Sequence, residues 1–219
     1  MLDLMSKQQL RDHLKHESRV LGTRALEEAF DAIDRKDFIV SDCAVEAYED
    51  YPLPIGYEQT ISQPTTVFFM LELLDVKAGN KVLDIGSGSG WTTALLSKLA
   101  GEHGYVRGVE RIPELIVFGQ ANLKKYQLKN TEIMKALDTY GWPGELYDRI
   151  LVSAGAEELP QELIDQLKPE GVMVIPVGDS ILKICKLKNG NIEKTEFPGF
   201  VFVPLIKTKC LTNEASPYV

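Results

Sequence analysis

The sequence predicts an α/β protein built on a doubly wound, mainly parallel sheet of seven strands, with helices before it and an antiparallel hairpin at its end. Two observations predict this fold class. Between residues 81 and 178, short apolar runs alternate with helical segments, as parallel strands joined by right-handed crossovers require. After residue 180, apolar and polar residues alternate singly around Asn189-Gly190, which is the pattern of an antiparallel hairpin.

The composition is that of a globular, acidic protein. The chain has 219 residues, of which 44% are hydrophobic and 26% charged, and a net charge of −8 at pH 7. Nucleic acid is not an expected partner, because phosphate contacts need clustered lysines and arginines. No apolar run approaches the roughly 18 residues of a membrane span, and the N-terminus lacks the apolar core of a signal peptide. We therefore expect a cytoplasmic protein that does not bind a membrane.

Nothing in the sequence suggests a disulfide or a metal site. Cys43, Cys185 and Cys210 are far apart and form no CxxC pair. His13 and His16 could share a helix face, but no further ligands stand near them, so we expect both on a solvated helix surface. The scarcity of histidine and the absence of a GxSxG motif also disfavour a hydrolase.

Two helices are expected before the sheet, the second over residues 23–34 with Thr23 as its N-cap. Residues 35–60 lose all periodicity, and a connection of that length is usually functional. A third helix is expected from Pro64, because proline suits the first helical turn. We expect residues 1–62, the N-terminal helices and a substrate loop, to pack as one unit with a ligand-binding domain of residues 63–219.

The elements of the sheet follow in regular order. Strands are expected at residues 81–85, 105–110, 131–136, 147–154 and 171–178. Helices are expected between them at residues 91–100, 113–126 and 159–167. The hairpin covers residues 180–197 with a type I′ turn at Asn189-Gly190, and residues 199–206 read as one more strand.

The stretch VLDIGSGSG contains three glycines, Gly86, Gly88 and Gly90, between the first strand of the sheet and its helix. Glycines let a backbone approach a ligand closely, and the N-terminus of a helix lies just beyond. The spacing differs from the GxGxxG of dinucleotide sites, and Asp84 stands two residues upstream. By itself the pattern leaves a ligand loop and a plain tight turn equally open.

Acidic residues stand at the ends of the next two strands. Glu110 ends the second strand, where a carboxylate can accept hydrogen bonds from paired ribose hydroxyls. Asp138 follows the third strand, where it can accept from an adenine amino group. Because the carboxyl ends of parallel strands meet at one edge of the sheet, we expect Asp84, Glu110 and Asp138 to gather there. An ordinary exposed acid is the alternative for Glu110 and Asp138.

The glycine loop with Glu110 and Asp138 resembles the motif series of class I S-adenosylmethionine-dependent methyltransferases, which have a Rossmann-like fold. More specifically, PLPIGYEQTISQP at residues 52–64, with ERIPEL, IPVG and FVPL, is similar to the protein-L-isoaspartate O-methyltransferase family. The resemblance runs from about Leu21 to Ile206. It implies methyl transfer from S-adenosylmethionine to the free carboxylate of L-isoaspartyl residues in damaged peptides and proteins, with S-adenosylhomocysteine as product. We expect a cytoplasmic repair enzyme that acts as a monomer.

The resemblance also implies site residues. Ser62 is the expected active-site residue, Thr60 offers a second hydroxyl, and Ile61 lies between them. The strand expected at residues 199–206 could add a substrate peptide as a further strand, with Val203, Pro204 and Leu205 near the substrate. The residues expected to bind the cofactor are Asp84, Gly86, Ser87, Gly88, Gly90, Glu110, Arg111, Asp138 and Thr139.

The chemistry of this reaction suits hydroxyl groups. An isoaspartyl α-carboxylate is ionised at neutral pH and is itself the nucleophile, so no strong base is needed. The enzyme must desolvate the carboxylate and orient it in line with the methyl group, which hydroxyl and backbone N–H donors can do. The alternative for Ser62 is that it only caps the helix beginning at Pro64.

The chain departs from the family at a few positions. Glu58 stands where the family usually has glycine or glutamine; pointing inward it would repel an anionic substrate, and pointing outward it would be harmless. Leu137-Asp138-Thr139 stands where the family has GDG. Two further hypotheses stay open: a methyltransferase of the same fold that acts on a different carboxylate or a modified peptide, and a non-catalytic cofactor-binding protein.

Overall fold

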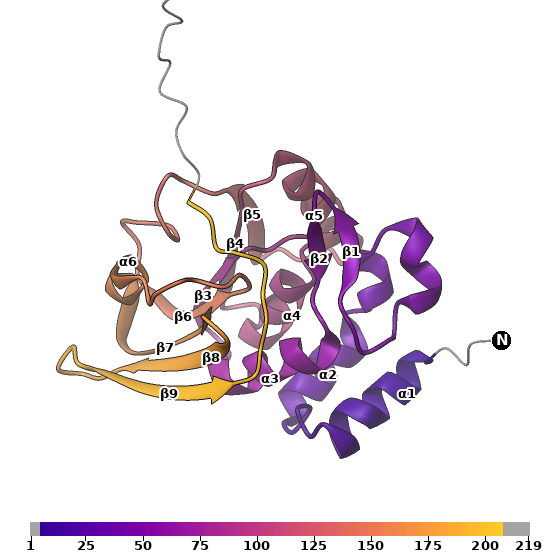
Figure 1. Ribbon diagram of the computed structural model, residues 1–219, viewed down its shortest axis with the longest axis horizontal. Helices are drawn as coiled ribbons and strands as arrows, with labels where there is room; N and C mark the ends of the chain where they lie inside the picture. The colour runs from indigo at the N-terminus through magenta and orange to yellow at the C-terminus, as the bar shows by residue number, and fades with distance from the viewer. Residues whose placement is uncertain (1–4, 208–219) are drawn as a thin grey trace, which may run out of the picture.

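The computed structural model describes residues 5–207, and its centre is one seven-stranded sheet with the order β5-β4-β3-β6-β7-β8-β9 (Figure 1). The strands are β3 (Lys81–Ile85), β4 (Tyr105–Glu110), β5 (Thr131–Lys135), β6 (Tyr147–Val152), β7 (Leu167–Val177), β8 (Ser180–Lys186) and β9 (Ile192–Pro198). Strands β3 to β7 pair in parallel, whereas β8 pairs antiparallel with both β7 and β9. The mainly parallel sheet and its C-terminal hairpin are therefore confirmed.

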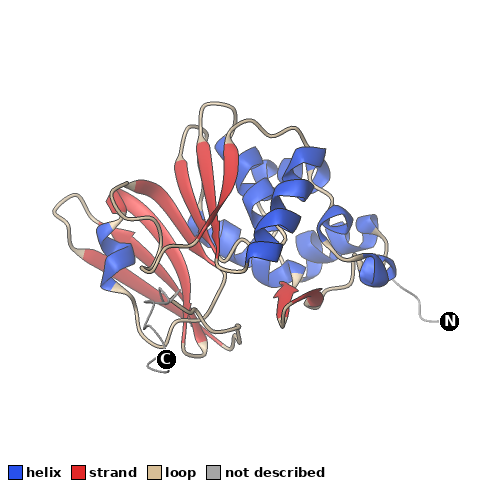
Figure 2. Cartoon of the chain, turned by 90° about the horizontal axis from the view of Figure 1, so that it is seen from above, coloured by secondary structure: helices blue, strands red, loops and turns tan. Residues whose placement is uncertain are grey.

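Helices cover both faces of this sheet, although unequally. They are α1 (Lys7–Asp12), α2 (Arg24–Ala32), α3 (Pro64–Leu74), α4 (Trp91–Ala100), α5 (Pro113–Lys125) and α6 (Gln161–Asp165). Figure 2 shows α6 on one side of the sheet and the longer helices on the other. Thr23 caps α2 as expected, because its hydroxyl accepts the N–H of Leu26 at 3.4 Å. Helix α6 is shorter than expected, since β7 already begins at Leu167.

The segment expected to lack regular structure, residues 35–60, contains short elements. Two 3₁₀ helices, η2 (Arg35–Phe38) and η3 (Ser41–Glu46), precede a hairpin of β1 (Leu53–Gly56) and β2 (Gln59–Ile61). Tyr57 and Glu58 form its tip with φ of 55° and 58°, as both central residues of a type I′ turn require. The expectation was wrong because strands of three and four residues are too short to show a period.

The turn between β8 and β9 also differs from the type I′ turn expected. The N–H of Leu187 donates to Asn191 at 2.7 Å, and the N–H of Gly190 donates back to Leu187 at 2.9 Å. Only Gly190 in this loop has a positive φ, of 87°. The loop therefore has three residues and ends with a left-handed glycine, which is the next most common hairpin type.

Residues 199–207, called the strap below, do not form the strand expected there. The strap leaves β9 and crosses the molecule toward the carboxyl ends of the parallel strands (Figure 1). Its strand-like pairing is limited to one isolated parallel bridge between Pro204 and Gly155. The N–H of Gly155 donates to Val203 at 2.7 Å, and the N–H of Leu205 donates to Gly155 at 2.7 Å. Proline has no N–H to donate, which helps explain why this pairing stops after one bridge.

The N-terminal helices pack into the same hydrophobic core as the sheet. Phe68 of α3 is in edge contact with Phe30 of α2, at 5.6 Å between ring centroids, and with Trp91 of α4, at 6.1 Å. All three side chains are at most 4% exposed. This row of aromatic rings joins the N-terminal part to the first residue of the helix that follows the glycine loop.

Two expected absences can be examined within residues 5–207. No helix there is long and apolar enough to cross a membrane, and no three His, Cys, Asp or Glu side chains are grouped to hold a metal ion. His16 lies on the exposed helix surface as expected, whereas His13 is only half-buried and is engaged by two carboxylates. Its Nε2 is 3.3 Å from Asp50, its Nδ1 is 3.0 Å from Glu17, and its side chain is only 26% exposed. Cys210 lies outside the described residues.

Candidate active site

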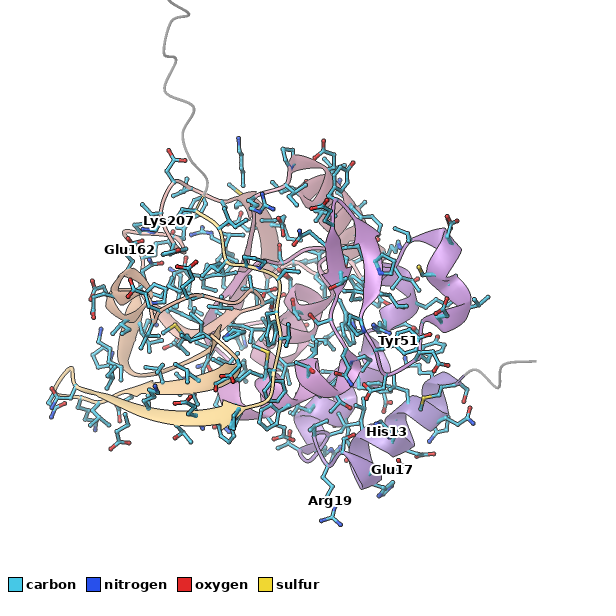
Figure 3. All side chains as sticks on the ribbon, viewed as in Figure 1. His13, Glu17, Arg19, Tyr51, Glu162 and Lys207 are labelled. Atoms are coloured by element: carbon cyan, nitrogen blue, oxygen red, sulfur yellow. The ribbon has the colours of Figure 1, made fainter. Side chains whose placement is uncertain are left out.

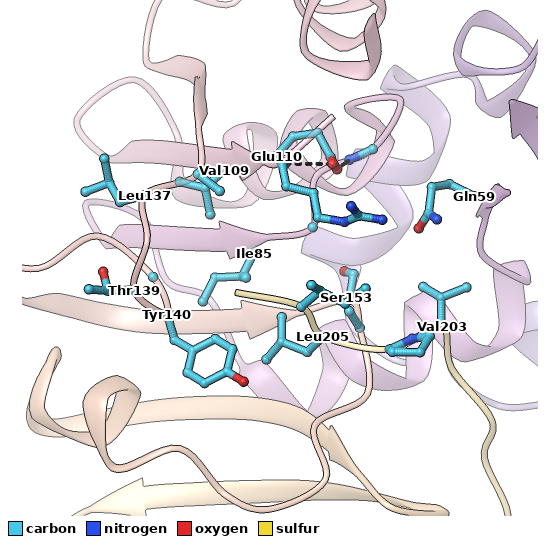
Figure 4. Close-up of a pocket in the computed structure, with 18 of the residues that line it drawn as sticks. Gln59, Ile85, Val109, Glu110, Leu137, Thr139, Tyr140, Ser153, Val203 and Leu205 are labelled. Carbon is cyan, nitrogen blue, oxygen red and sulfur yellow. Dashed lines mark hydrogen bonds between the residues drawn. The ribbon is translucent and has the colours of Figure 1, made fainter. Parts of the chain in front are cut away.

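A cavity that opens to solvent lies at the carboxyl ends of β3, β4 and β6 (Figure 4). In the sheet order, β3 has β4 on one side and β6 on the other, so the chain reverses direction along the sheet at this point. Doubly wound sheets bind ligands where this reversal occurs. The cavity is lined by the glycine loop, the ends of the strands, residues 136–137 and 139–141, the β1–β2 hairpin and the strap.

The glycine loop provides one wall of the cavity. Gly86 and Gly88 line it, and a Cβ atom on Gly88 would lie 3.3 Å from Cδ1 of Ile55 in the hairpin. Gly90 has a different role, because it precedes α4 and a Cβ there would lie 3.2 Å from the carbonyl oxygen of Gly119. Ser87 is 4% exposed and lines a smaller adjoining cavity.

Asp84 supports this loop from inside the protein. It is fully buried and does not line the cavity; its Oδ2 accepts hydrogen bonds from Thr92 at 2.8 Å and Thr93 at 2.6 Å. Burial raises the pKa of Asp84 to about 6, although the two threonine hydrogen bonds oppose the shift and the nearby charge of Glu110 adds to it. Asp84 therefore ties the end of β3 to the first turn of α4.

Glu110 is the acidic group that faces the cavity, although it is only 6% exposed. Its Oε1 accepts the N–H groups of Arg111 at 2.8 Å and Ile112 at 3.0 Å, and its Oε2 accepts the N–H of Gly88 at 3.0 Å. A carboxylate offers roughly four acceptor positions. Three are thus occupied by backbone donors, and Oε2 retains capacity for one ligand hydroxyl. Arg111 is exposed and lines the cavity beside it.

The loop after β5 contributes side chains that differ in part from those expected. Leu137, Thr139 and Tyr140 line the cavity (Figure 4). Asp138 is exposed and is not among the lining residues. The backbone of this loop turns the carboxylate at position 138 away and leaves the apolar side chain of Leu137 facing the cavity.

The Thr60-Ile61-Ser62 segment lies where three hollows meet. Thr60 lines the main cavity, the smaller cavity beside the glycine loop, and a groove between the hairpin and the strap. Ser62 lines the last two. Ile61 is 4% exposed and belongs to the hydrophobic core, so only its backbone is available to a ligand.

The hydroxyl of Ser62 does not cap α3. The N–H of Thr65 in the first turn donates to Oδ1 of Asp50 at 2.8 Å, and the Thr65 hydroxyl donates to Oδ2 at 2.8 Å. Gln63 occupies the N-cap position without a side-chain cap. No group within residues 5–207 hydrogen-bonds to the Ser62 hydroxyl, so the capping alternative is wrong and this hydroxyl is available to a ligand.

The strap closes the cavity on the side away from the glycine loop. Val203, Pro204 and Leu205 line the main cavity, and Val203 also borders the groove that Ser62 lines. The end of the strap is held by Glu162, whose carboxylate accepts from Nζ of Lys207 at 2.7 Å (Figure 3). Val203, Pro204 and Leu205, which were expected near the substrate, thus border the main cavity.

Three residues of the site have no part in the expectations from sequence. Ser153 follows β6 and borders all three hollows; its place after a parallel strand could have identified it. Asp50 and Arg35 do not follow a parallel strand, and nothing else in the sequence marks them as site residues. The guanidinium of Arg35 donates to the carbonyl oxygen of Ser62 at 3.2 Å, and burial lowers its pKa to about 10, although Asp50 opposes the shift.

These observations allow a fit test for S-adenosylmethionine. Among residues 5–207, the buried polar atoms without a partner include Oγ of Ser87, which lines the smaller cavity at the glycine loop. The free capacity of Glu110 suits a ribose hydroxyl, and Leu137 and Val109 offer apolar walls to a base. The residues present therefore fit a nucleoside with a polar tail.

Sequence comparison connects these features to known proteins. The profile of the family protein-L-isoaspartate(D-aspartate) O-methyltransferase matches residues 5–210. A protein-L-isoaspartate O-methyltransferase of Methanopyrus kandleri is 42% identical over 207 residues, which are 92% of this chain and 91% of that protein. A protein-L-isoaspartate O-methyltransferase 2 of Archaeoglobus fulgidus is 40% identical over 203 residues, with 91% and 92% coverage.

Structural comparison gives the same result. A Plasmodium falciparum protein, described as a protein-L-isoaspartate O-methyltransferase in complex with S-adenosyl-L-homocysteine, superimposes with a TM-score of 0.81 at 28% identity. The match covers 92% of this chain and 98% of that one.

Proposed function

The chain belongs to the protein-L-isoaspartate(D-aspartate) O-methyltransferase family, and we propose that Ser62 and Thr60 orient the carboxylate of an L-isoaspartyl residue for methylation. It is an S-adenosylmethionine-dependent methyltransferase. The observation that carries the assignment of Ser62 is its unengaged hydroxyl at the junction of two hollows, with the cap of α3 supplied by Asp50 instead.

The cofactor is proposed to bind in the cavity at the carboxyl ends of β3, β4 and β6. Oε2 of Glu110 would accept a ribose hydroxyl, and the backbone of Gly86–Gly88 would face the amino acid moiety. Thr139 and Arg111 line the same cavity and would contact the adenosine moiety. Asp84 and Gly90 would act indirectly, by shaping the loop, and Asp138 stays a prediction that its exposed position does not support.

The bound cofactor supplies an electrophilic methyl group on its sulfonium. The nucleophile is the substrate carboxylate, which is already ionised at neutral pH. Ser62 and Thr60 donate hydrogen bonds that fix its direction, and neither has to accept its proton. No histidine lines any of the three hollows within the described residues, which suits a transfer without general base catalysis.

The substrate peptide is proposed to lie in the groove between the hairpin and the strap. Its walls are Pro52, Gln63 and Thr66 on one side and residues 199–203 on the other. A groove open at the surface admits an extended chain, and free backbone groups on the strap could pair with it as an added strand. Ser62 lines this groove, so a carboxylate presented from the peptide can reach its hydroxyl.

Glu58 does not oppose an anionic substrate in this arrangement. It stands at the tip of the hairpin and is exposed, and it lines none of the three hollows. We also propose a reducing compartment such as the cytoplasm for this enzyme, because the two described cysteines, Cys43 and Cys185, are free thiols.

The deciding experiment uses two peptides that differ at one residue, L-isoaspartate or L-aspartate. A site that orients an α-carboxylate beside a β-linked backbone should methylate the first at least about a hundredfold faster, since a misplacement of about 1 Å can cost that much. The product should release methanol in mild base, because a neighbouring backbone amide can attack the ester. A base-stable product, or equal rates on both peptides, would indicate another methyl acceptor. Tight cofactor binding without methylation would indicate a non-catalytic protein.

A further inference from the structure

A buried arginine lies directly behind the active-site loop. Arg35 begins η2 and is 2% exposed. Its Nη1 donates to the carbonyl oxygens of Ala47 at 2.9 Å and Glu49 at 3.0 Å. Its Nη2 donates to those of Tyr51 at 2.9 Å and Ser62 at 3.2 Å. One guanidinium therefore joins four backbone groups from two separate segments.

The choice of partners is informative. A buried guanidinium is costly unless it is paired, and pairing with a carboxylate is the usual solution. No carboxylate within residues 5–207 forms an ion pair with Arg35. All its acceptors are instead main-chain carbonyls, which the rigid, planar fork of arginine can reach together and the point charge of lysine cannot. Arg35 is thus used to fix the path of the backbone.

We propose that Arg35 is a positioning residue for methyl transfer, which holds the Ser62 backbone so that the Ser62 hydroxyl meets the substrate carboxylate. On the other side of Ser62, the side chain of Ile61 is fixed in the hydrophobic core. With both neighbours of the Ser62 Cα held, the direction of the hydroxyl depends on one side-chain rotation. This inference rests on the role proposed for Ser62.

A second contact of Arg35 connects the loop to the cofactor side. Its guanidinium carbon lies 5.5 Å from the ring centroid of Trp91, the first residue of α4 after the glycine loop. Trp91 and Ser62 line the same small cavity, together with Gly86. Arg35 therefore touches both the loop that presents the hydroxyl and the helix that begins beside the cofactor loop, and it sets one relative to the other.

The first test compares Arg35→Lys with Arg35→Gln. Arg24→Lys is the control, because Arg24 is exposed and its one ion pair among the described residues is with Glu28. Loss of positioning should lower kcat for an isoaspartyl peptide at least about tenfold in a folded Arg35 variant. Peptide KM and the Kd for S-adenosylhomocysteine should each change less than about threefold, because the missing interaction is one of the transition state. Arg24→Lys should leave all three values unchanged.

A double-mutant cycle with Ser62→Ala separates this role from a general one. If Arg35 acts through the Ser62 hydroxyl, Arg35→Lys should change kcat less than about twofold once that hydroxyl is absent. Full additivity of the two changes would overturn the inference while leaving Ser62 in its proposed role. An unchanged kcat in the single Ser62→Ala variant would instead refute that proposed role.

Two further outcomes would also overturn the inference. A folded Arg35 variant with normal kcat and a lower melting temperature would assign Arg35 to stability alone. The inference would also be overturned if both Arg35 variants failed to fold, because Arg35 would then be assigned to stability. Folding is judged by S-adenosylhomocysteine binding and by the circular dichroism of the native chain.

Discussion

The carboxylate of Asp50 caps helix α3 by accepting the backbone N–H of Thr65, with 2.8 Å between Oδ1 and N. Asp50 is also 3.3 Å from Nε2 of His13 and accepts from the side chain of Gln63 at 3.1 Å. Asp50 precedes the β1–β2 hairpin in sequence, and its side chain holds Gln63 and Thr65, which follow the hairpin. Both ends of the PLPIGYEQTISQP stretch are therefore anchored outside the hairpin, and the hydroxyl groups between them are left for a ligand.

Because Asp50 caps α3 and Ser62 is proposed to act on the substrate, substitution of Ser62 should affect the rate alone and substitution of Asp50 should affect stability. Ser62→Ala should lower methyl transfer at least about tenfold, or about 1.4 kcal/mol in barrier, with an unchanged melting temperature. Asp50→Ala should lower the free energy of unfolding by about 1 kcal/mol, the usual cost of a lost N-cap. Urea unfolding and initial rates on an isoaspartyl peptide measure both. A stability loss in Ser62→Ala with a normal rate per folded molecule would contradict the assignment.

Glu110 should dominate the affinity for the cofactor product. Glu110→Ala removes a charge-assisted acceptor and releases the N–H of Gly88, so we expect binding of S-adenosylhomocysteine to weaken by about 2 kcal/mol or more. Asp138→Ala is the matched control, since it removes a carboxylate that does not line the cavity. Isothermal titration should show less than about a threefold change for it. Equal losses in both variants would mean that Asp138 turns inward when the ligand binds.

Asp84 should make the stability of the protein depend on pH. Its folded-state pKa is about 6, above the ordinary value of 3.8, because the side chain is buried. Between these values the folded state binds more protons than the unfolded state, so this contribution to stability falls as pH rises from about 4 to 6. The total loss is about 3 kcal/mol.

The measurement is the free energy of unfolding of the native chain minus that of Asp84→Asn, at several pH values from 4 to 7. This difference should fall with rising pH, because the amide does not titrate. Thr93→Val is a useful companion: it removes a hydrogen bond that lowers the pKa of Asp84, and should move the window to higher pH. A difference that is flat across this range would refute the buried titration.

Glu58 should be a source of strain in the hairpin and have no part in catalysis. Its φ of 58° is left-handed, a conformation that costs most residues about 1–2 kcal/mol and glycine little. Glu58→Gly should therefore raise the free energy of unfolding by about 0.5–1 kcal/mol, after allowance for the greater flexibility of glycine in the unfolded chain. Glu58→Ala keeps the strain and removes the charge, and should gain nothing. A shared gain in both variants would point to the charge instead.

The strap offers a local test of substrate docking. Within the described residues, the C=O of Val203 and the N–H of Leu205 are both bonded to Gly155, whereas the N–H of Phe202 has no backbone partner. In an extended chain the backbone groups of Phe202 point away from those of Val203, so a peptide added as a strand should slow hydrogen exchange at Phe202 and leave Leu205 as protected as before. The matched aspartyl peptide is the control. Unchanged exchange at Phe202 with saturating isoaspartyl peptide would exclude pairing at this edge of the strap.

The central parallel strands could be predicted from the sequence because they are buried on both faces. In β3, for example, four of five residues are buried, so the strand reads as one apolar run bounded by polar turns. The ends of such strands then located the glycine loop and Glu110. The β1–β2 hairpin could not be found in this way, since alternation over Leu53–Gly56 covers only two buried residues.

The supports of the site were beyond prediction for a different reason. Arg35 and Asp50 act on backbone groups 12 to 27 residues away in the chain, and backbone carbonyls carry no signature in a sequence. The contrast between Leu137 and Asp138 is similar, because the path of an irregular loop decides which of two adjacent side chains faces the cavity. Such choices depend on tertiary packing, which spacing along the chain does not encode.

The contact of Ile55 with Gly88 couples the cofactor site to the substrate groove. The side chain of Ile55 belongs to the hairpin that carries Thr60, and it rests against the loop that faces the cofactor. A shift of that loop on cofactor binding would alter the hairpin, and occupation of the substrate groove would act back on the loop. Thermodynamic reciprocity requires the two effects to be equal in free energy. The coupling free energy between cofactor and substrate can thus be obtained from either affinity, measured with and without the other ligand.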